Sequence, residues 1–355
     1  MNIGGTQIGP GHAPYIIAEI GVNHDGEVDR ALQLTDAAAE TGADAVKLQY
    51  FETDRLMSKA AKLAAYQKAA GETDPIAMLR RLELSINEMS RVVDRAHERG
   101  IHAIVTVFST ELVDQAEQLG WDAYKTASPD IIHKPLLDRL MQTGQPMIVS
   151  TGASTLDEVL RAVGWLDDAL NRLALLQCVS CYPAEDPALG GIRVLNTITR
   201  LVTGYSDHTS SVAMGRDAVS AGALVLEKHL TYDRSAAGPD HHVSLDAARF
   251  REYVELARSG FSARTSVEQI PADLAHEKVV LGCEWDVRSV SRQSVVAMMD
   301  LAPGVTIRAD HLTCKRPGSG IEPFRMPELV GRQIEKPVEA DMPLSDEDFA
   351  PVGVP

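Results

Sequence analysis

Short apolar runs alternate with amphipathic stretches over the first 260 residues of this 355-residue chain. Each run has the length of a buried β-strand and is bounded by polar or glycine-containing turns. The runs cover residues 15–21, 45–50, 101–108, 123–128, 146–152, 173–180, 201–208 and 224–231. The pattern therefore predicts eight strands.

The stretches between these runs carry apolar residues at helical spacing. The predicted helices cover residues 28–41, 86–99, 111–119, 136–143, 156–166, 212–221 and 247–259. Five of them end at a glycine, the residue favoured just after a helix. Eight strand–helix units predict an α/β fold of the (β/α)8 barrel type, because an open doubly wound sheet usually has about five or six strands.

The pattern changes after Gly260. Residues 261–279 are polar without clear periodicity, and short β-like pieces such as 289–298 follow among many Pro and Gly residues. We predict a catalytic barrel domain over residues 1–260, a linker over 261–283 and a small β-rich domain over 284–355. The long connection 52–85 after the second strand is expected to cross the barrel rim as a lid.

Charge and composition exclude several classes of protein. Lys and Arg number 34 against 50 Asp and Glu, a net charge of −16 that disfavours nucleic acid and anionic membranes as partners. No signal peptide or membrane-spanning stretch is evident, so we expect a cytoplasmic protein. The four cysteines are too few and scattered for a disulfide framework, and the Cys178/Cys181 pair lacks the second pair of a four-cysteine zinc site.

Polar residues gather at the C-terminal ends of all eight predicted strands. In a barrel these ends converge on one mouth, where active sites lie. The residues are Glu19, Lys47, Gln49, Thr106, Lys125, Ser128, Ser150, Ser180, Ser206, His208 and His229. One polar strand end is commonplace, but eight together predict an active site.

His208 and His229 end the seventh and eighth strands, which are neighbours in a closed barrel. Two imidazoles with open coordination positions suit Mn, Fe, Co or Zn better than Mg, which prefers oxygen ligands. Either histidine alone could be an ordinary core residue. Together, with Glu19 and Asp240 near the same mouth, they predict a divalent metal site.

Lys47 and Lys125 lie inside strand patterns, where a charge is costly unless it meets an anion or a counter-charge. Three alternatives stay open: a buried ion pair with Glu19 or Asp44, a phosphate and carboxylate site, or a Schiff base. The neighbouring hydroxyls favour a bound phosphorylated anion. The chain has neither a G-x-x-x-x-G-K-[ST] nor a G-x-G-x-x-G motif, which argues against a nucleotide.

Motifs along nearly the whole chain resemble the sialic acid synthase family, in order and in spacing. They are IIAEIGVNHDG (16–26), GADAVKLQ (42–49), AYKTAS (123–128), STG (150–152), YSDHT (205–209), LEKHLT (226–231), GPDHHVSL (238–245) and CKRPGSGI (314–321). The tail resembles a type III antifreeze protein. The resemblance implies an enzyme that condenses phosphoenolpyruvate with an N-acetylated mannose-type sugar, cleaves a C–O bond and releases phosphate. It also implies Mn²⁺ as the metal, with Mg²⁺ or Co²⁺ as alternatives.

The resemblance also implies residue roles. His208 and His229 would bind the metal, and Arg316 would reach the sugar N-acetyl group from the tail of the other subunit in a domain-swapped homodimer. Phosphoenolpyruvate would be held by Lys47, Lys125, Thr106, Ser128, Ser150, Ser180 and Ser206. The sugar would contact Glu19, Tyr182 and Asp240, with Asn23 and Gln49 also in substrate binding.

The sequence departs from the family pattern at the ends of three strands. The third strand ends in VTVFS where STPFS is commoner, with Thr106 kept. Asp130 stands where the family usually has Glu, and we assign it the role of base for the attacking water, with a reach one methylene shorter. Ser180 stands where many members have Asn.

Three other functions remain open. They are a deoxy-octulosonate or deoxy-heptulosonate phosphate type of condensation, a Schiff-base aldolase and an inactive sugar-binding paralogue. Residues 57–85 look closer to the sialic and legionaminic branch than to the pseudaminic one.

Overall fold

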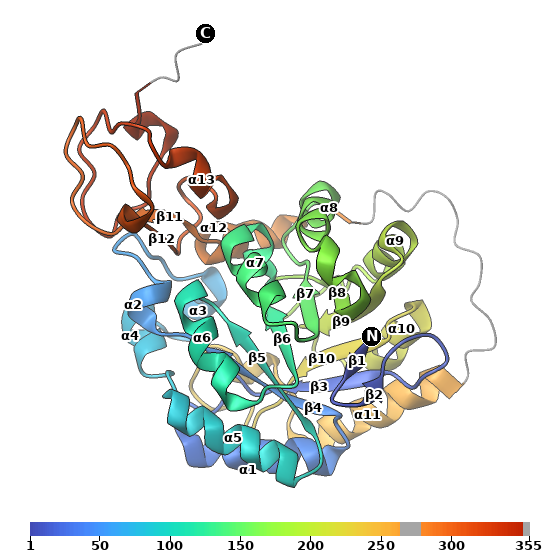
Figure 1. Cartoon of the computed structure of the whole chain (residues 1–355). Coiled ribbons are helices and arrows are strands. Elements are labelled where there is room, and N and C mark those ends of the chain that lie inside the picture. Colours follow the sequence, from blue (N-terminus) through green and yellow to red (C-terminus); the bar gives the residue numbers. More distant parts are fainter. Residues whose placement is uncertain (263–277, 351–355) are drawn as a thin grey trace.

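The computed structural model describes residues 1–262 and 278–350, and its centre is a closed barrel of parallel strands (Figure 1). The strand order around the barrel is β10-β3-β4-β5-β6-β7-β8-β9. The strands are β3 (Tyr15–Glu19), β4 (Ala45–Tyr50), β5 (His102–Val107), β6 (Ala123–Thr126), β7 (Met147–Ser150), β8 (Leu173–Cys178), β9 (Val202–Asp207) and β10 (Val225–His229). All eight predicted strands and the barrel are confirmed.

Apolar side chains fill the N-terminal half of the barrel. Ile17, Ile104 and Ile148 form one buried cluster with Ile3, which lies in a small hairpin of β1 (Asn2–Ile3) and β2 (Thr6–Gln7), and with Ile8, which follows that hairpin. The hairpin closes the bottom of the barrel, and sequence periodicity did not reveal it. The polar strand ends are therefore left at the opposite mouth.

Helices surround the barrel (Figure 1). They are α1 (Val28–Thr41), α5 (Ile86–Glu98), α6 (Val113–Ala116), α7 (Lys134–Gln142), α8 (Leu156–Trp165), α9 (Gly190–Thr199), α10 (Met214–Ala221) and α11 (Ala247–Ser262). The predicted helix 111–119 is broken, because 3₁₀ turns at Thr110–Leu112 and Glu117–Leu119 flank α6. Within residues 1–262 and 278–350, no helix combines the length and apolar character needed to cross a membrane.

Helix α9 was absent from the predicted helices. Its sequence, GGIRVLNTIT, opens with two glycines and is rich in β-branched residues, both of which lower helix propensity. Ile192, Val194 and Leu195 are buried in the structure. This helix is therefore stabilised by packing of its apolar face against the barrel and not by local helix propensity.

The connection after β4 crosses the barrel mouth, as expected. It carries three short helices, α2 (Thr53–Leu56), α3 (Ala65–Ala69) and α4 (Pro75–Arg80). Leu56, Met78 and Leu82 form a separate small core with Phe51 and Phe108. We refer to residues 52–85 as the rim excursion.

The tail has its own core and lies beside the rim excursion (Figure 1). Strands β11 (Ser294–Ala297) and β12 (Leu312–Lys315) pair antiparallel, and two helices, α12 (Trp285–Ser291) and α13 (Met326–Leu329), accompany them. The β-like reading of residues 289–298 is wrong in its first part, where α12 ends. Of the predicted linker, 263–277 lies outside the described residues.

Candidate active site

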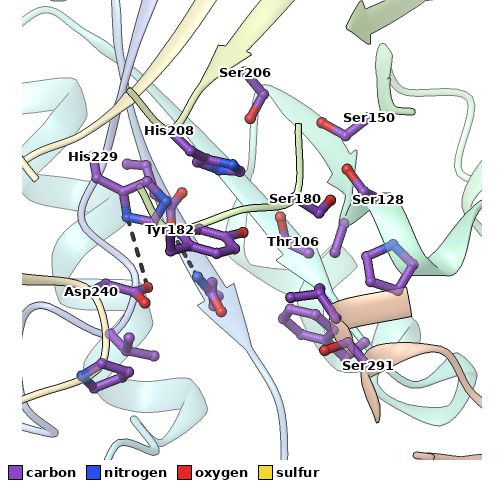
Figure 2. A pocket seen from close by; sticks show the side chains of 18 of the residues that line it. Thr106, Ser128, Ser150, Ser180, Tyr182, Ser206, His208, His229, Asp240 and Ser291 are labelled. Carbon is purple, nitrogen blue, oxygen red and sulfur yellow. Dashed lines mark hydrogen bonds and ion pairs between the residues drawn. The ribbon is translucent and has the colours of Figure 1, made fainter. Parts of the chain in front are cut away.

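A cavity lies at the C-terminal mouth of the barrel, beneath the rim excursion and the tail (Figure 2). Every site residue predicted from the sequence lines it, except Asn23 and Asp130. The lining residues among them are Glu19, Lys47, Gln49, Thr106, Lys125, Ser128, Ser150, Ser180, Tyr182, Ser206, His208, His229, Asp240 and Arg316. The barrel thus brings together side chains from seven strands, from the loop after β8 and from the tail.

The two histidines face each other across the ends of β9 and β10, with ring centroids 5.6 Å apart. Nδ1 of His208 donates to the carbonyl of Val179 at 2.9 Å, so a metal ion would bind at Nε2. Burial alone would lower the pKa of His208, but Cys178 and the Val179 carbonyl raise it to about 9, so metal binding at Nε2 would displace a proton. Nδ1 of His229 is buried without a hydrogen-bond partner and lies 3.8 Å from a carboxylate oxygen of Asp240. Burial lowers the pKa of His229, so its imidazole is neutral.

This arrangement fits a divalent ion. One carbonyl fixes the tautomer of His208, and His229 has a buried nitrogen without a partner. Across residues 1–262 and 278–350, no three His, Cys, Asp or Glu side chains cluster as a complete metal site. Two imidazoles would leave the remaining coordination positions open to water and substrate, as in a catalytic site.

Both strand lysines are almost completely buried and paired. Lys47 forms an ion pair with Glu19 and donates to Thr106 Oγ1 at 3.1 Å. Nζ of Lys125 lies 3.2 Å from a carboxylate oxygen of Glu227. Of the two predicted partners, Glu19 is correct for Lys47, whereas Asp44 instead accepts a hydrogen bond from the backbone of Ile16.

The two lysines differ in their electrostatics. Burial would lower the pKa of Lys47, but the carboxylates of Glu19 and Glu227 outweigh it and raise that pKa. For Lys125, burial and the neighbouring Lys47 outweigh Glu227 and lower the pKa. Burial alone would raise the pKa of Glu227, but the two lysines hold it at about 2. The cavity therefore holds a compact set of opposite charges.

Hydroxyl groups line the opposite side of the cavity (Figure 2). Ser128 Oγ accepts from the backbone amide of Gly152 at 3.0 Å, and Ser150 Oγ has no hydrogen-bond partner. A Cβ atom at Gly152 would lie 2.4 Å from Ser180 Oγ and 2.8 Å from Ser128 Oγ. Glycine is therefore required for these three chain segments to approach so closely.

Aromatic and charged side chains form the outer part of the site. Tyr182 packs against His208, with ring centroids 4.2 Å apart, and stacks on Tyr66 of the rim excursion at 4.6 Å. The guanidinium of Arg316 lies over Phe108, 5.3 Å from the ring centroid. In the described chain Arg316 thus reaches the cavity of its own barrel, held by a backbone hydrogen bond of 2.8 Å to Leu56.

Asn23 and Asp130 lie away from the cavity surface. The Asn23 amide donates to the Leu230 carbonyl at 2.9 Å and to Ser244 Oγ at 2.8 Å, so it joins loops beside the mouth. Asp130 accepts from Gln293 of the tail at 3.2 Å, and its other carboxylate oxygen is buried without a partner. Burial raises the pKa of Asp130 to about 7.

Several lining residues escaped the sequence reasoning, Glu227 and Tyr66 among them. Glu227 precedes His229 by two positions, so strand alternation places both on the same face and could have revealed it. Tyr66 comes from the rim excursion, where no periodicity indicates which side chain turns inward. Only the folded arrangement identifies Tyr66.

Comparison with known proteins agrees with this geometry. Residues 34–269 match the NeuB family, and residues 292–350 match the SAF domain. The chain is 35% identical to N,N'-diacetyllegionaminic acid synthase from Legionella pneumophila, over 92% of each protein.

Solved structures show the same likeness. The spore coat polysaccharide biosynthesis protein SpsE from Bacillus subtilis is 27% identical, with a TM-score of 0.84 over 99% of both chains. The sialic acid synthetase from Leptospira borgpetersenii, solved with citrate, is 26% identical, with a TM-score of 0.68 over 78% of this chain and 94% of that one. The family match covers more than half of the chain, and this chain therefore belongs to the NeuB family and carries a C-terminal SAF domain.

Proposed function

We propose that this enzyme condenses phosphoenolpyruvate with an N-acetylated amino sugar of the mannosamine type, and that C–O cleavage releases phosphate. One observation carries the proposal. Two buried lysines, a group of serine hydroxyls and two metal-competent histidines line the same cavity. Cations and hydroxyls suit the phosphate and carboxylate of the first substrate, whereas an open-chain aldehyde suits the histidine side.

Different side chains bind the two substrates. Lys47 and Lys125 neutralise phosphoenolpyruvate, and Thr106, Ser128, Ser150, Ser180 and Ser206 donate hydrogen bonds to it. Glu19, Tyr182 and Asp240 contact the sugar, with Gln49 holding Glu19 through a 3.0 Å hydrogen bond. Arg316 donates to the sugar acyl group.

The reaction joins the enol carbon of phosphoenolpyruvate to the sugar aldehyde carbon, and the aldehyde oxygen takes up a proton. The former enol centre becomes oxocarbenium-like and accepts water, after which its bond to the phosphate oxygen breaks. A divalent ion held by His208 and His229, Mn²⁺ first with Mg²⁺ or Co²⁺ as alternatives, supplies Lewis-acid polarisation of the aldehyde. Asp130 is proposed as the base for water, although in the described structure it contacts Gln293 instead.

We also propose the finer assignments. The sugar is of the sialic or legionaminic type, supported by the 35% identity with a legionaminic acid synthase. The enzyme works in the cytoplasm as a homodimer in which the SAF domains are exchanged. The catalytic domain comprises residues 1–260, the linker 261–283 and the SAF domain 284–355.

Phosphate release with Mn²⁺ tests this function directly. Phosphoenolpyruvate is supplied with N-acetylmannosamine or with a 2,4-diacetamido-trideoxy hexose, and we expect release with only one of these sugar types. No release with any of them would contradict the proposal. A phosphorylated aldose, arabinose 5-phosphate or erythrose 4-phosphate, serves as the control for the related condensations.

A Schiff-base aldolase is the second candidate, because burial lowers the pKa of Lys125. Borohydride reduction with pyruvate distinguishes the two functions. The synthase forms no imine and stays unmodified, whereas an aldolase gains the mass of a reduced pyruvate adduct at Lys125 or Lys47.

A further inference from the structure

The segment that enters the SAF domain also contacts the barrel loops that carry the serine hydroxyls. We refer to residues 278–293, which include α12, as the junction segment. Nζ of Lys278 donates to the carbonyl of Thr151 at 2.6 Å, in the loop between β7 and α8. Both partners are buried. The junction segment is therefore attached beside Ser150, at the proposed phosphoenolpyruvate site.

Glu284 makes the central contact of this attachment. One of its carboxylate oxygens accepts from the backbone amide of Ala153 at 2.6 Å and from that of Ser180 at 2.8 Å. Its other oxygen accepts from the backbone amide of Leu281 at 2.9 Å. Only 1% of Glu284 is exposed, so these charge-assisted bonds replace water for a buried charge. A single carboxylate thus bridges the loops after β7 and β8.

A separate set of ion pairs holds the same segment against α8. Arg288 and Arg292 each bind both carboxylate oxygens of Glu158 on α8, at 2.8 to 3.0 Å. Arg288 also donates to the carbonyl of Ala153 at 2.6 Å. The junction segment would therefore stay attached to the barrel without Glu284. A change at Glu284 can then test whether this residue positions the site, because it does not release the segment.

We propose that Glu284 is a positioning residue for phosphoenolpyruvate. The inference rests on the proposed function. Ser128 and Ser180 approach each other around Gly152, and Glu284 ties the residue after Gly152 to Ser180. Its carboxylate thereby sets the spacing of the hydroxyls that receive the phosphate. Docking of the SAF domain then completes the phosphoenolpyruvate half of the site as well as the sugar half, whether the segment comes from the same chain or from a second copy.

The test compares Glu284→Gln with Glu322→Gln in the full-length enzyme. Glu322 lies in the SAF domain, 39% exposed and 3.9 Å from Arg292, and it serves as the matched control for loss of an acid. For Glu284→Gln we expect the KM for phosphoenolpyruvate to rise about tenfold, the effect of losing roughly one charge-assisted hydrogen bond. The KM for the sugar should change less than about twofold, because no contact to the sugar is removed.

A second measurement does not depend on turnover. Phosphoenolpyruvate should raise the Tm of the wild type, and this rise should shrink in Glu284→Gln at the same ligand concentration. A lower Tm of the ligand-free variant with unchanged KM values and an unchanged ligand-induced rise would give Glu284 a structural role only and overturn the inference. A wild-type enzyme that neither binds phosphoenolpyruvate nor releases phosphate would instead refute the proposed function.

Discussion

Nζ of Lys125 lies 3.2 Å from a carboxylate oxygen of Glu227 inside the barrel, and both side chains are almost completely buried. Lys47 pairs in the same way with Glu19. A buried pair contributes little net stability, because desolvation offsets much of the attraction. Two such pairs at the mouth of one barrel are better explained as cations held in place for an anionic substrate.

Lys47→Ala and Lys125→Ala should therefore weaken the use of phosphoenolpyruvate. Each change removes a cation from a protein of charge −16, and we expect a loss of about 2 to 5 kcal/mol in transition-state stabilisation. The measurement is kcat/KM for phosphoenolpyruvate. Lys134→Ala, which breaks a half-exposed helix pair with Asp138, is the control and should behave as wild type. Wild-type kinetics in both strand variants would make the lysines structural.

Removal of the metal should abolish phosphate release. The imidazole rings of His208 and His229 lie with their centroids 5.6 Å apart, and the proposed Lewis-acid role requires the ion during turnover. We expect dialysis against a chelator to remove activity and added Mn²⁺ to restore it. Full activity of a His208→Ala His229→Ala double variant would eliminate the metal from the mechanism.

The strand ends were predictable because each lies inside a run whose period and boundaries are local. His208, for example, follows directly from the position at which an apolar run stops, and Thr106 lies two residues before the end of another run. Glu284 and Tyr66 were not predictable, because their neighbours come from distant segments. Glu284 binds a loop 131 residues earlier in the chain, and no spacing rule relates such positions. Asp130 shows that a motif can locate a residue in the chain without fixing the direction of its side chain. It follows strand β6 as predicted, but its carboxylate contacts Gln293.

Gly152→Ala should impair phosphoenolpyruvate binding. The added Cβ would lie 2.4 Å from Ser180 Oγ, closer than real Cβ contacts, so the loops must separate. We expect a rise of at least about tenfold in the KM for phosphoenolpyruvate, roughly the cost of one lost hydrogen bond to a charged group. Gly164→Ala is the matched control, because that helical glycine has free space around it and the change should stabilise α8 by about 0.5 to 1 kcal/mol. Equal KM values in the two variants would contradict the close approach.

Asp130 should make stability depend on pH. Burial raises its folded pKa to about 7, above the ordinary value of 3.8, so the folded state holds the proton more tightly than the unfolded state. This contribution is complete below about pH 4 and is lost as the pH rises toward 7. Asp130→Asn imitates the protonated acid, so the variant should match the wild type at pH 4 and exceed its stability at pH 8.

Urea unfolding at the two pH values measures this difference, which should be roughly 1 to 4 kcal/mol. Asp286→Asn, at an exposed position of α12, should not differ from the wild type in this pH-dependent way. A difference in the free energy of unfolding between Asp130→Asn and the wild type that is the same at both pH values would refute the raised pKa. Loss of phosphate release in the folded variant would support the role of Asp130 as the base.

The exchange of SAF domains between subunits can be tested with two native thiols. Cys181 follows Ser180 after β8, and Cys283 precedes Glu284, whose carboxylate accepts from the Ser180 backbone amide at 2.8 Å, so the two thiols lie on neighbouring segments. Cys283 is exposed and Cys181 half-buried, whereas Cys178 and Cys314 are buried. Mild oxidation with diamide takes two electrons and two protons from the Cys181 and Cys283 thiols and joins their sulfurs.

A disulfide between the barrel of one subunit and the SAF domain of its partner gives a covalent dimer on a denaturing gel without reductant, and we expect this dimer band. Cys181→Ser should remove it, which separates it from chance links between exposed Cys283 thiols. An oxidised species that migrates as a monomer, and reverts with reductant, would show that each SAF domain closes its own barrel.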